Sequence, residues 1–116
     1  MDKEFRDTMR TSFIFPVRIG LQIEGEKKFF HAFSNDISQG GIKVSIQKDL
    51  PVKEKLDLRF DLLNEDRFIN QISTGAFIAW KNEIKKGLFE YGISFEKLSK
   101  GDWLVVVDFI KTYCFE

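Results

Sequence analysis

Cysteine and histidine are almost absent from this 116-residue sequence, which contains one of each, Cys114 and His31. A single cysteine excludes a disulfide within the chain, and a reducing compartment is the simplest interpretation. A single histidine excludes a multi-histidine metal site or a Ser-His-Asp triad built from this chain alone. We interpret His31 as an ordinary strand residue and Cys114 as a buried, inert thiol. We therefore expect no enzymatic activity, no metal site and no cofactor.

Net charge and long apolar runs are also missing. Eighteen basic residues balance eighteen acidic ones. Without a broad positive field, non-specific binding to DNA, RNA or an anionic membrane is not expected. The first residues are charged and no apolar run is long enough to cross a bilayer, so we expect neither a signal peptide nor membrane insertion. A cytoplasmic protein is the expectation, and any anion site in it must be local.

Apolar side chains are plentiful and occur in short alternating runs. Hydrophobic residues make up 43% of the chain, and 13 residues are phenylalanine, which is enough for a single core at this length. Alternation of apolar and polar residues is typical of half-buried strands. We expect strands over residues 13–23, 28–37, 42–46, 56–62, 68–80 and 89–95. We expect turns at 24–26, 64–66 and 81–86, and a bulge or bend at Gly75. This pattern predicts an antiparallel barrel or sandwich, without deciding between them.

The period changes after Phe95. Ser99 can cap a helix, with Asp102 in its first turn. Residues at helical spacing then form one stripe: Trp103, Val106, Val107, Ile110 and Cys114. The β-branched residues 105–107 mildly disfavour a helix, and by local preference alone the segment could be a strand. We predict a helix over 99–114 packed against the strands. Trp80 and Trp103 are interpreted as packing residues, with a role for Trp80 at a barrel mouth left open.

The most distinctive segment is 35–41, Asn-Asp-Ile-Ser-Gln-Gly-Gly, between two strand-like runs. Asp36 and Ser38 supply short side-chain oxygens that can bind the local backbone or a ligand. Gly40 and Gly41 permit positive φ and let a bulky group approach the main chain closely. Taken alone, the segment is most simply a structural Asx turn.

A second feature lies near the N-terminus, where Arg6 and Arg10 are separated by three residues. The two side chains would share a face if the segment were helical. We expect residues 1–11 to be flexible alone and ordered when they clamp a ligand. Arginine binds phosphate or a guanine edge bidentately, and its flat face stacks on a base.

Together, R-x-x-x-R and then D-x-S-x-x-G resemble the PilZ domain family, whose members bind the bacterial second messenger cyclic di-GMP. Arg6 and Arg10 match the two arginine positions, and Asp36, Ser38 and Gly41 match the D, S and G positions. The resemblance covers nearly the whole chain. It implies an all-β fold with one helix, a six- or seven-stranded antiparallel PilZ-type β-barrel with a C-terminal α-helix. The expected single domain comprises a flexible segment 1–11, a barrel 12–96 and a helix 99–114.

The resemblance also implies a non-catalytic receptor for cyclic di-GMP. The implied ligand-binding residues are Arg6, Arg10, Asp36, Ser38, Gly40 and Gly41. The arginines would grip phosphates and bases, Asp36 would accept hydrogen bonds from a guanine, Ser38 would bind a phosphate or base, and the glycines would leave room. Phe5 stands where family members often carry Arg or Gln, which favours one ligand molecule per chain over a stacked pair. The receptor would signal to a downstream protein partner by rearranging its N-terminal segment.

Two alternatives remain at this point. Some members of the family no longer bind nucleotide and act as adaptors in pilus or motility machinery, although these usually lack the arginine pair. An enzyme or an oligonucleotide-binding barrel is the third possibility. The sequence offers no nucleophile–base arrangement for the former, and its neutral charge counts against the latter.

Overall fold

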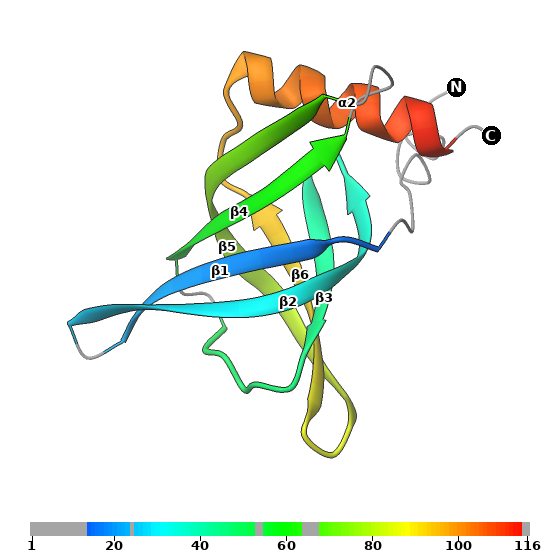
Figure 1. The fold of residues 1–116 in the computed structure, drawn as a ribbon. Coiled ribbons are helices and arrows are strands. Elements are labelled where there is room, and N and C mark those ends of the chain that lie inside the picture. Colours follow the sequence, from blue (N-terminus) through cyan, green and yellow to red (C-terminus); the bar gives the residue numbers. More distant parts are fainter. Residues whose placement is uncertain (1–13, 24, 53–54, 64–67, 115–116) are drawn as a thin grey trace.

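A computed structural model of the chain describes residues 14–23, 25–52, 55–63 and 68–114. Six antiparallel strands form a closed barrel in the order β1-β2-β3-β6-β5-β4, followed by a helix, α2 (Figure 1). The elements are β1 Pro16–Ile23, β2 Glu26–Ser38, β3 Gly41–Ile46, β4 Lys55–Leu63, β5 Ile69–Lys85, β6 Leu88–Phe95 and α2 Lys100–Cys114. The predicted barrel with a closing helix is confirmed, with six strands. Closure pairs every strand on both sides and leaves no open sheet edge.

The barrel interior is built by the predicted alternation. In β4, for example, Leu56, Leu58, Phe60 and Leu62 are buried while the residues between them face outwards. Each fully buried side chain of this size contributes about 1.5–3 kcal/mol relative to an exposed one. The same alternation holds in β1 apart from Gly20 and in the middle of β2, where Phe29, His31 and Phe33 share one face as expected and that face is exposed.

The helix α2 lies across one open end of the barrel (Figure 1). Ser99 caps it as predicted, because its Oγ accepts a hydrogen bond from Asp102 N at 3.1 Å. Val106, Phe109 and Ile110 form its buried face. The prediction that Trp103 belongs to this face is wrong, since its side chain is 42% exposed and packing begins with the following turn. The Cys114 side chain, predicted to be buried, lies outside what the structure describes. No helix formed by the described residues is long and apolar enough to cross a membrane.

Two hairpins, β1–β2 and β5–β6, extend beyond the barrel (Figure 1). Their turns contain Gly25 and Gly87, whose φ values of 83° and 85° favour glycine. The turn predicted over 81–86 is wrong, because β5 continues to Lys85 and the chain reverses at residues 86–87. This part of β5 is exposed on both faces, so it carries charged residues and no apolar alternation. The turn predicted over 64–66 lies outside the described residues.

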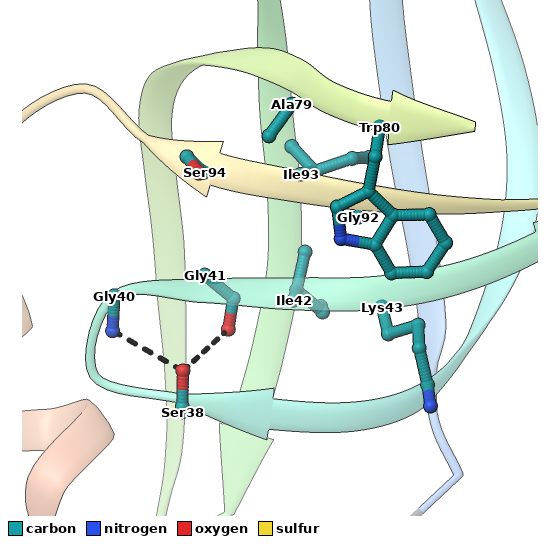
Figure 2. Close-up of a pocket in the computed structure, with 10 residues that line it drawn as sticks. All are labelled: Ser38, Gly40, Gly41, Ile42, Lys43, Ala79, Trp80, Gly92, Ile93 and Ser94. Atoms are coloured by element: carbon teal, nitrogen blue, oxygen red, sulfur yellow. Dashed lines mark hydrogen bonds between the residues drawn. The ribbon is translucent and has the colours of Figure 1, made fainter. Parts of the chain in front are cut away.

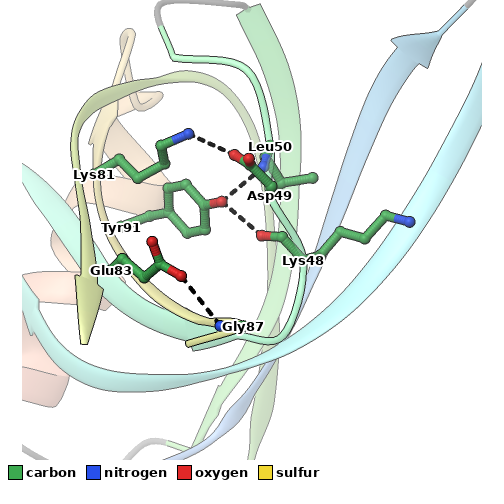
Figure 3. A network of polar contacts seen from close by, with 7 residues as sticks. All are labelled: Lys48, Asp49, Leu50, Lys81, Glu83, Gly87 and Tyr91. Atoms are coloured by element: carbon green, nitrogen blue, oxygen red, sulfur yellow. Dashed lines mark hydrogen bonds and ion pairs between the residues drawn. The ribbon is translucent and has the colours of Figure 1, made fainter. Parts of the chain in front are cut away.

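Tyr91 ties the β3–β4 connection to the barrel (Figure 3). Its hydroxyl donates a hydrogen bond to Lys48 O at 2.6 Å and accepts one from Leu50 N at 2.7 Å. Beside it, Lys81 Nζ pairs with Asp49. Burial raises the pKa of the Tyr91 hydroxyl, and the hydrogen bond to Asp49 raises the pKa of Lys81. The connection is therefore held at three successive residues, Lys48, Asp49 and Leu50.

Phe15 anchors the chain just before β1. Its carbonyl oxygen accepts a hydrogen bond from Ser34 N at 2.8 Å. Its buried ring lies 5.7 Å from the ring of Phe60 and 5.9 Å from that of Phe109, measured between centroids. One aromatic side chain thus contacts both the barrel and α2.

Candidate functional site

A bulge in β2 places the distinctive turn. The β2–β3 register shifts between Ser34 and Asp36, so Asn35 is an extra residue. In an uninterrupted strand Asp36 would point inwards like the buried Ser34. The shift instead pairs Asp36 with Lys43 on the outer side and directs Ile37, which is fully buried, into the core.

The turn after β2 is stabilised by Ser38. Its Oγ accepts a hydrogen bond from Gly40 N at 3.3 Å and donates one to Gly41 O at 3.4 Å (Figure 2). These bonds fulfil the structural interpretation of the segment. Neither Gly40 nor Gly41 uses the positive φ that glycine permits, because the described glycines with positive φ are Gly25 and Gly87.

Gly40 and Gly41 lack side chains for different reasons. A Cβ at Gly41 would lie 2.3 Å from the backbone oxygen of Ile93, so glycine allows β3 and β6 to approach. A Cβ at Gly40 would meet nothing within 4 Å. The free space expected above the turn is therefore at Gly40, whereas the space at Gly41 is taken by the neighbouring strand.

A second bulge turns Trp80 outwards. The β5–β6 register shifts between Ile78 and Trp80, which leaves Ala79 as the extra residue. Trp80 would otherwise point inwards with the buried Ile78. Its interpretation as a packing residue is wrong: the side chain is 43% exposed and lies on Gly92 of β6 (Figure 2). A Cβ at Gly92 would lie 2.1 Å from Trp80 Nε1, so this glycine makes room for the indole. Of the bulge or bend predicted at Gly75, the bulge is absent from the β4–β5 pairing, since Gly75 pairs in register with Asp57.

Between the turn and the indole lies a pocket of about 310 Å³ (Figure 2). The turn forms one wall, Trp80 forms another, and β3 and β6 run beneath. Its lining residues are Ser38, Gly40, Gly41, Ile42, Lys43, Ala79, Trp80, Gly92, Ile93 and Ser94. The pocket combines backbone and hydroxyl hydrogen-bonding groups, one cation and one flat aromatic face.

Lys43 supplies the positive charge of the pocket. Its Nζ lies 4.0 Å from Glu90 Oε2, and Glu90 also accepts a hydrogen bond from Asn35 Nδ2 at 3.2 Å. Asn35 Nδ2 in turn donates to Ser45 Oγ at 2.8 Å, so the bulge residue is tied to both β3 and β6. Sequence reasoning missed Lys43 as a site residue, because it reads only as the polar partner of Ile42 and Val44 in an alternating strand.

The structure brings three of the predicted site residues together: Ser38, Gly40 and Gly41 line the pocket. Asp36 lies at its side, in register with the lining residue Lys43. Arg6, Arg10 and Phe5 lie outside the described residues. His31 is exposed on β2, as predicted. Among the described side chains, no group of three His, Cys, Asp or Glu residues is placed to hold a metal ion.

The sequence profile of the PilZ domain matches residues 3–115. The chain belongs to the PilZ domain family. Binding of cyclic di-GMP is the general role of PilZ domains, and the family is generally non-catalytic. A search of curated proteins finds no match.

Two solved PilZ structures are similar to this one. One is the Bacillus subtilis Inhibitor of motility (MotI/DgrA), with a TM-score of 0.74 and 23% identity over 89% of this chain. The chain spans 48% of that protein, about half of its length. The other is the PilZ domain of CeSA from a cellulose-synthesizing bacterium, with a TM-score of 0.57 and 16% identity. That comparison covers 89% of this chain and 95% of the other. At these identities the similarity shows the fold alone.

Proposed function

We propose that this PilZ domain is a receptor that binds cyclic di-GMP in the pocket between the β2–β3 turn and Trp80. The observation that carries the proposal is the pair of bulges. They turn Trp80 to the outside of the barrel and place the half-buried Asp36 opposite Lys43, and both Trp80 and Lys43 line the pocket. Arg6 and Arg10 would close over the ligand from the N-terminal segment.

The chemistry of the pocket fits a guanine nucleotide. The exposed indole of Trp80 offers a flat surface on which a base can stack, worth about 1–3 kcal/mol per base. Asp36 can accept hydrogen bonds from the N–H edge of a guanine, which presents donors that adenine lacks at that edge. Ser38 and Lys43 can contact phosphate oxygens, and a charge-assisted bond contributes about 1.5–3 kcal/mol.

The pocket is small for the whole ligand. A volume of about 310 Å³ is at the lower end for ligand sites, which supports a site that is completed by a second segment. Arginine is suited to this task, because its guanidinium binds phosphate or a guanine edge bidentately and stacks on a base.

The N-terminal segment joins the barrel at Phe15, close enough to the pocket for its arginines to reach a ligand there. The Phe15 carbonyl accepts a hydrogen bond from Ser34 N. Ser38 is four residues further along β2, so it lies roughly 13 Å from Ser34 at the rise of a strand. Arg10 precedes Phe15 by five residues, and an extended chain of that length reaches about 17 Å. Chain length therefore permits Arg10 to contact a ligand beside Ser38.

Titration calorimetry of the full chain with cyclic di-GMP tests the proposal. We expect micromolar binding or tighter, about −8 kcal/mol, with one ligand per chain. The Arg6→Ala/Arg10→Ala variant should bind at least about 150-fold more weakly, because two charge-assisted contacts of about 1.5 kcal/mol each are lost. The matched control, Lys85→Ala/Lys86→Ala, removes the same charge from the exposed β5–β6 hairpin and should bind normally. No heat at about 100 μM protein, a concentration that detects micromolar affinity, would refute receptor function.

Trp80 provides an optical test of the location. In a Trp103→Phe background, Trp80 is the sole indole of the chain, and stacking of a base on it should quench its fluorescence as ligand is added. Trp80→Ala should weaken binding about 10-fold, which corresponds to the loss of one stacked base. Unchanged fluorescence at saturating ligand would place the nucleotide elsewhere on the protein.

The output of such a receptor would come from the N-terminal segment. If residues 1–11 take a different arrangement over bound ligand, a partner protein that distinguishes the two arrangements responds to cyclic di-GMP. The alternative is an adaptor that does not depend on nucleotide. In that case a partner protein would bind equally with and without cyclic di-GMP, and the Arg6→Ala/Arg10→Ala variant would bind the partner as the parent does.

A further inference from the structure

A row of outward-facing residues crosses four strands on the side of the barrel formed by β2, β1, β4 and β5. In register, His31 lies opposite Arg18, Arg18 opposite Arg59, and Arg59 opposite Ser73. All four side chains are exposed. We call His31, Arg18, Arg59 and Ser73 the arginine row. It shares no lining residue with the pocket beside Trp80.

The two arginines of the row make no ion pair with the described carboxylates, unlike four of the described lysines. The ion pairs among the described residues are all made by lysines: Lys27–Asp57, Lys43–Glu90, Lys55–Glu96 and Lys81–Asp49. Within this part of the protein, neither Arg18 nor Arg59 has a carboxylate within ion-pair distance. They instead stand opposite each other, and like charges at directly opposite positions of an antiparallel pair destabilise a sheet.

Aromatic side chains border the arginine row. The Arg18 guanidinium lies 4.2 Å from the centroid of the Phe29 ring, which holds it in place by a cation–π contact. Phe33, opposite Pro16 in the adjacent position, is 60% exposed. Beside these aromatic residues, a shallow depression of about 270 Å³ is lined by Arg18, His31 and Arg59 of the row and by Pro16, which is paired with Phe33. An arginine that is already held before binding loses less conformational freedom when a partner arrives.

We propose that the arginine row is a docking surface for an acidic segment of a partner protein, with carboxylates bound between Arg18 and Arg59 and an apolar side chain against Phe33. A carboxylate placed there removes the repulsion between the two guanidiniums and matches their bidentate geometry. Arginine and exposed aromatic residues are also the types that are enriched in protein interfaces.

The charges around the row favour a protein over a polyanion. Asp61 lines the same depression and Asp57 lies in the neighbouring position on β4, so negative charge borders the arginines. Nucleic acid binding requires several phosphate contacts along a positive surface, and this chain has no net charge. One or two carboxylates on a protein segment can bind the arginines between Asp57 and Asp61. A continuous phosphate backbone would instead be repelled by these two acidic side chains.

Nuclear magnetic resonance on the isotope-labelled full chain tests the docking surface. The probe is a synthetic extended peptide with glutamates at alternate positions around one phenylalanine, and its control carries glutamine in place of each glutamate. We expect the amide signals of Arg18, Arg59 and Phe33 to shift, with a dissociation constant of about 1 mM or tighter. The glutamine peptide should bind at least about fivefold more weakly, because it lacks the charge. No shift of these signals at about 2 mM peptide, or equal shifts with both peptides, would overturn the proposal.

Charge reversal supplies the matched pair of variants. Arg18→Glu/Arg59→Glu should abolish the peptide-induced shifts, whereas Lys85→Glu/Lys86→Glu, with the same change of net charge, should retain them. The affinity for cyclic di-GMP should be unaffected by Arg18→Glu/Arg59→Glu. A wrong proposal for the docking surface and a wrong proposal for the nucleotide site would therefore give different results. Inorganic phosphate or a single-stranded oligonucleotide that shifts the row more strongly than the glutamate peptide would assign the site to phosphate instead.

A second measurement tests the repulsion directly. In low salt, Arg59→Gln should raise the melting temperature by about 1–4 °C, because it removes one of two opposed like charges. Added salt should reduce the difference in melting temperature between Arg59→Gln and the parent, because it screens the repulsion. A melting temperature that is unchanged or lower would remove the argument that the arginines await a negative partner.

Discussion

Two sides of the barrel are built differently. The pairings β1–β2, β1–β4 and β4–β5 keep one register along their whole length, while β2–β3 and β5–β6 contain shifts. On the regular side, buried residues alternate with more exposed ones along the whole of β4. The shifted side flanks the pocket. One of its shifts turns Trp80 from the interior to the surface, and another places the half-buried Asp36 opposite Lys43. Regular pairing thus builds the core, and the interruptions shape the pocket.

The largest expected effect is on the regular side. Leu58→Ala removes a fully buried side chain from β4 and should lower the free energy of unfolding by about 2–5 kcal/mol. Urea denaturation at equilibrium measures this loss. The affinity for cyclic di-GMP, measured on the folded fraction, should stay within about twofold, since additivity holds for distant sites. A large change in affinity would show that the two sides are not separable.

A smaller loss is expected beside the pocket, on the shifted side. Gly41→Ala should lower the free energy of unfolding by about 1–3 kcal/mol, because its Cβ would overlap the Ile93 carbonyl. Gly40→Ala is the matched control, with open space and no positive φ, and should change stability by less than about 0.5 kcal/mol. Equal losses in thermal denaturation for the two variants would contradict the different roles of the two glycines.

A loss of about 1–2 kcal/mol is expected for Tyr91→Phe, which leaves Leu50 N without its hydroxyl partner. The variant also tests pH dependence. Because burial raises the pKa of Tyr91 above 10.0 in the folded protein, its protonated form stabilises the fold at neutral pH. That contribution is lost as pH rises from 10 through the folded pKa. Chemical denaturation between pH 9 and pH 11 should therefore show the parent losing stability more steeply than Tyr91→Phe, while parallel curves would contradict this assignment.

Sequence reasoning succeeded where the pairing is regular. The strands containing Val17 and Leu58 follow from alternation, and the helix start at Ser99 follows from capping chemistry. The turn around Ser38 was also recognisable, since short polar side chains and glycine have defined local roles. Closure into a barrel followed from family resemblance, because alternation does not distinguish a barrel from a sandwich.

Sequence reasoning failed where a register shift reversed the faces of a strand. Trp80 was interpreted as a packing residue, and nothing in the sequence around Ala79 indicates the extra residue that turns the indole outwards. The charge-rich residues 81–86 resemble a turn, although they form the exposed part of a long hairpin. The sequence does contain a sign of the outward position of Trp80, because Gly92 lacks the side chain that would collide with the indole. Using it would require knowing that Gly92 pairs with Trp80, and this depends on the register between β5 and β6.

The position of Phe15 has a mechanical consequence. This ring touches Phe60 in the barrel wall and Phe109 in the terminal helix, and it is the first buried side chain among the described residues. A displacement of the chain at Phe15 can therefore be transmitted to the helix through this ring. If the N-terminal segment bound a nucleotide and the helix bound a protein, each ligand would alter the affinity for the other by the same factor, as thermodynamic reciprocity demands.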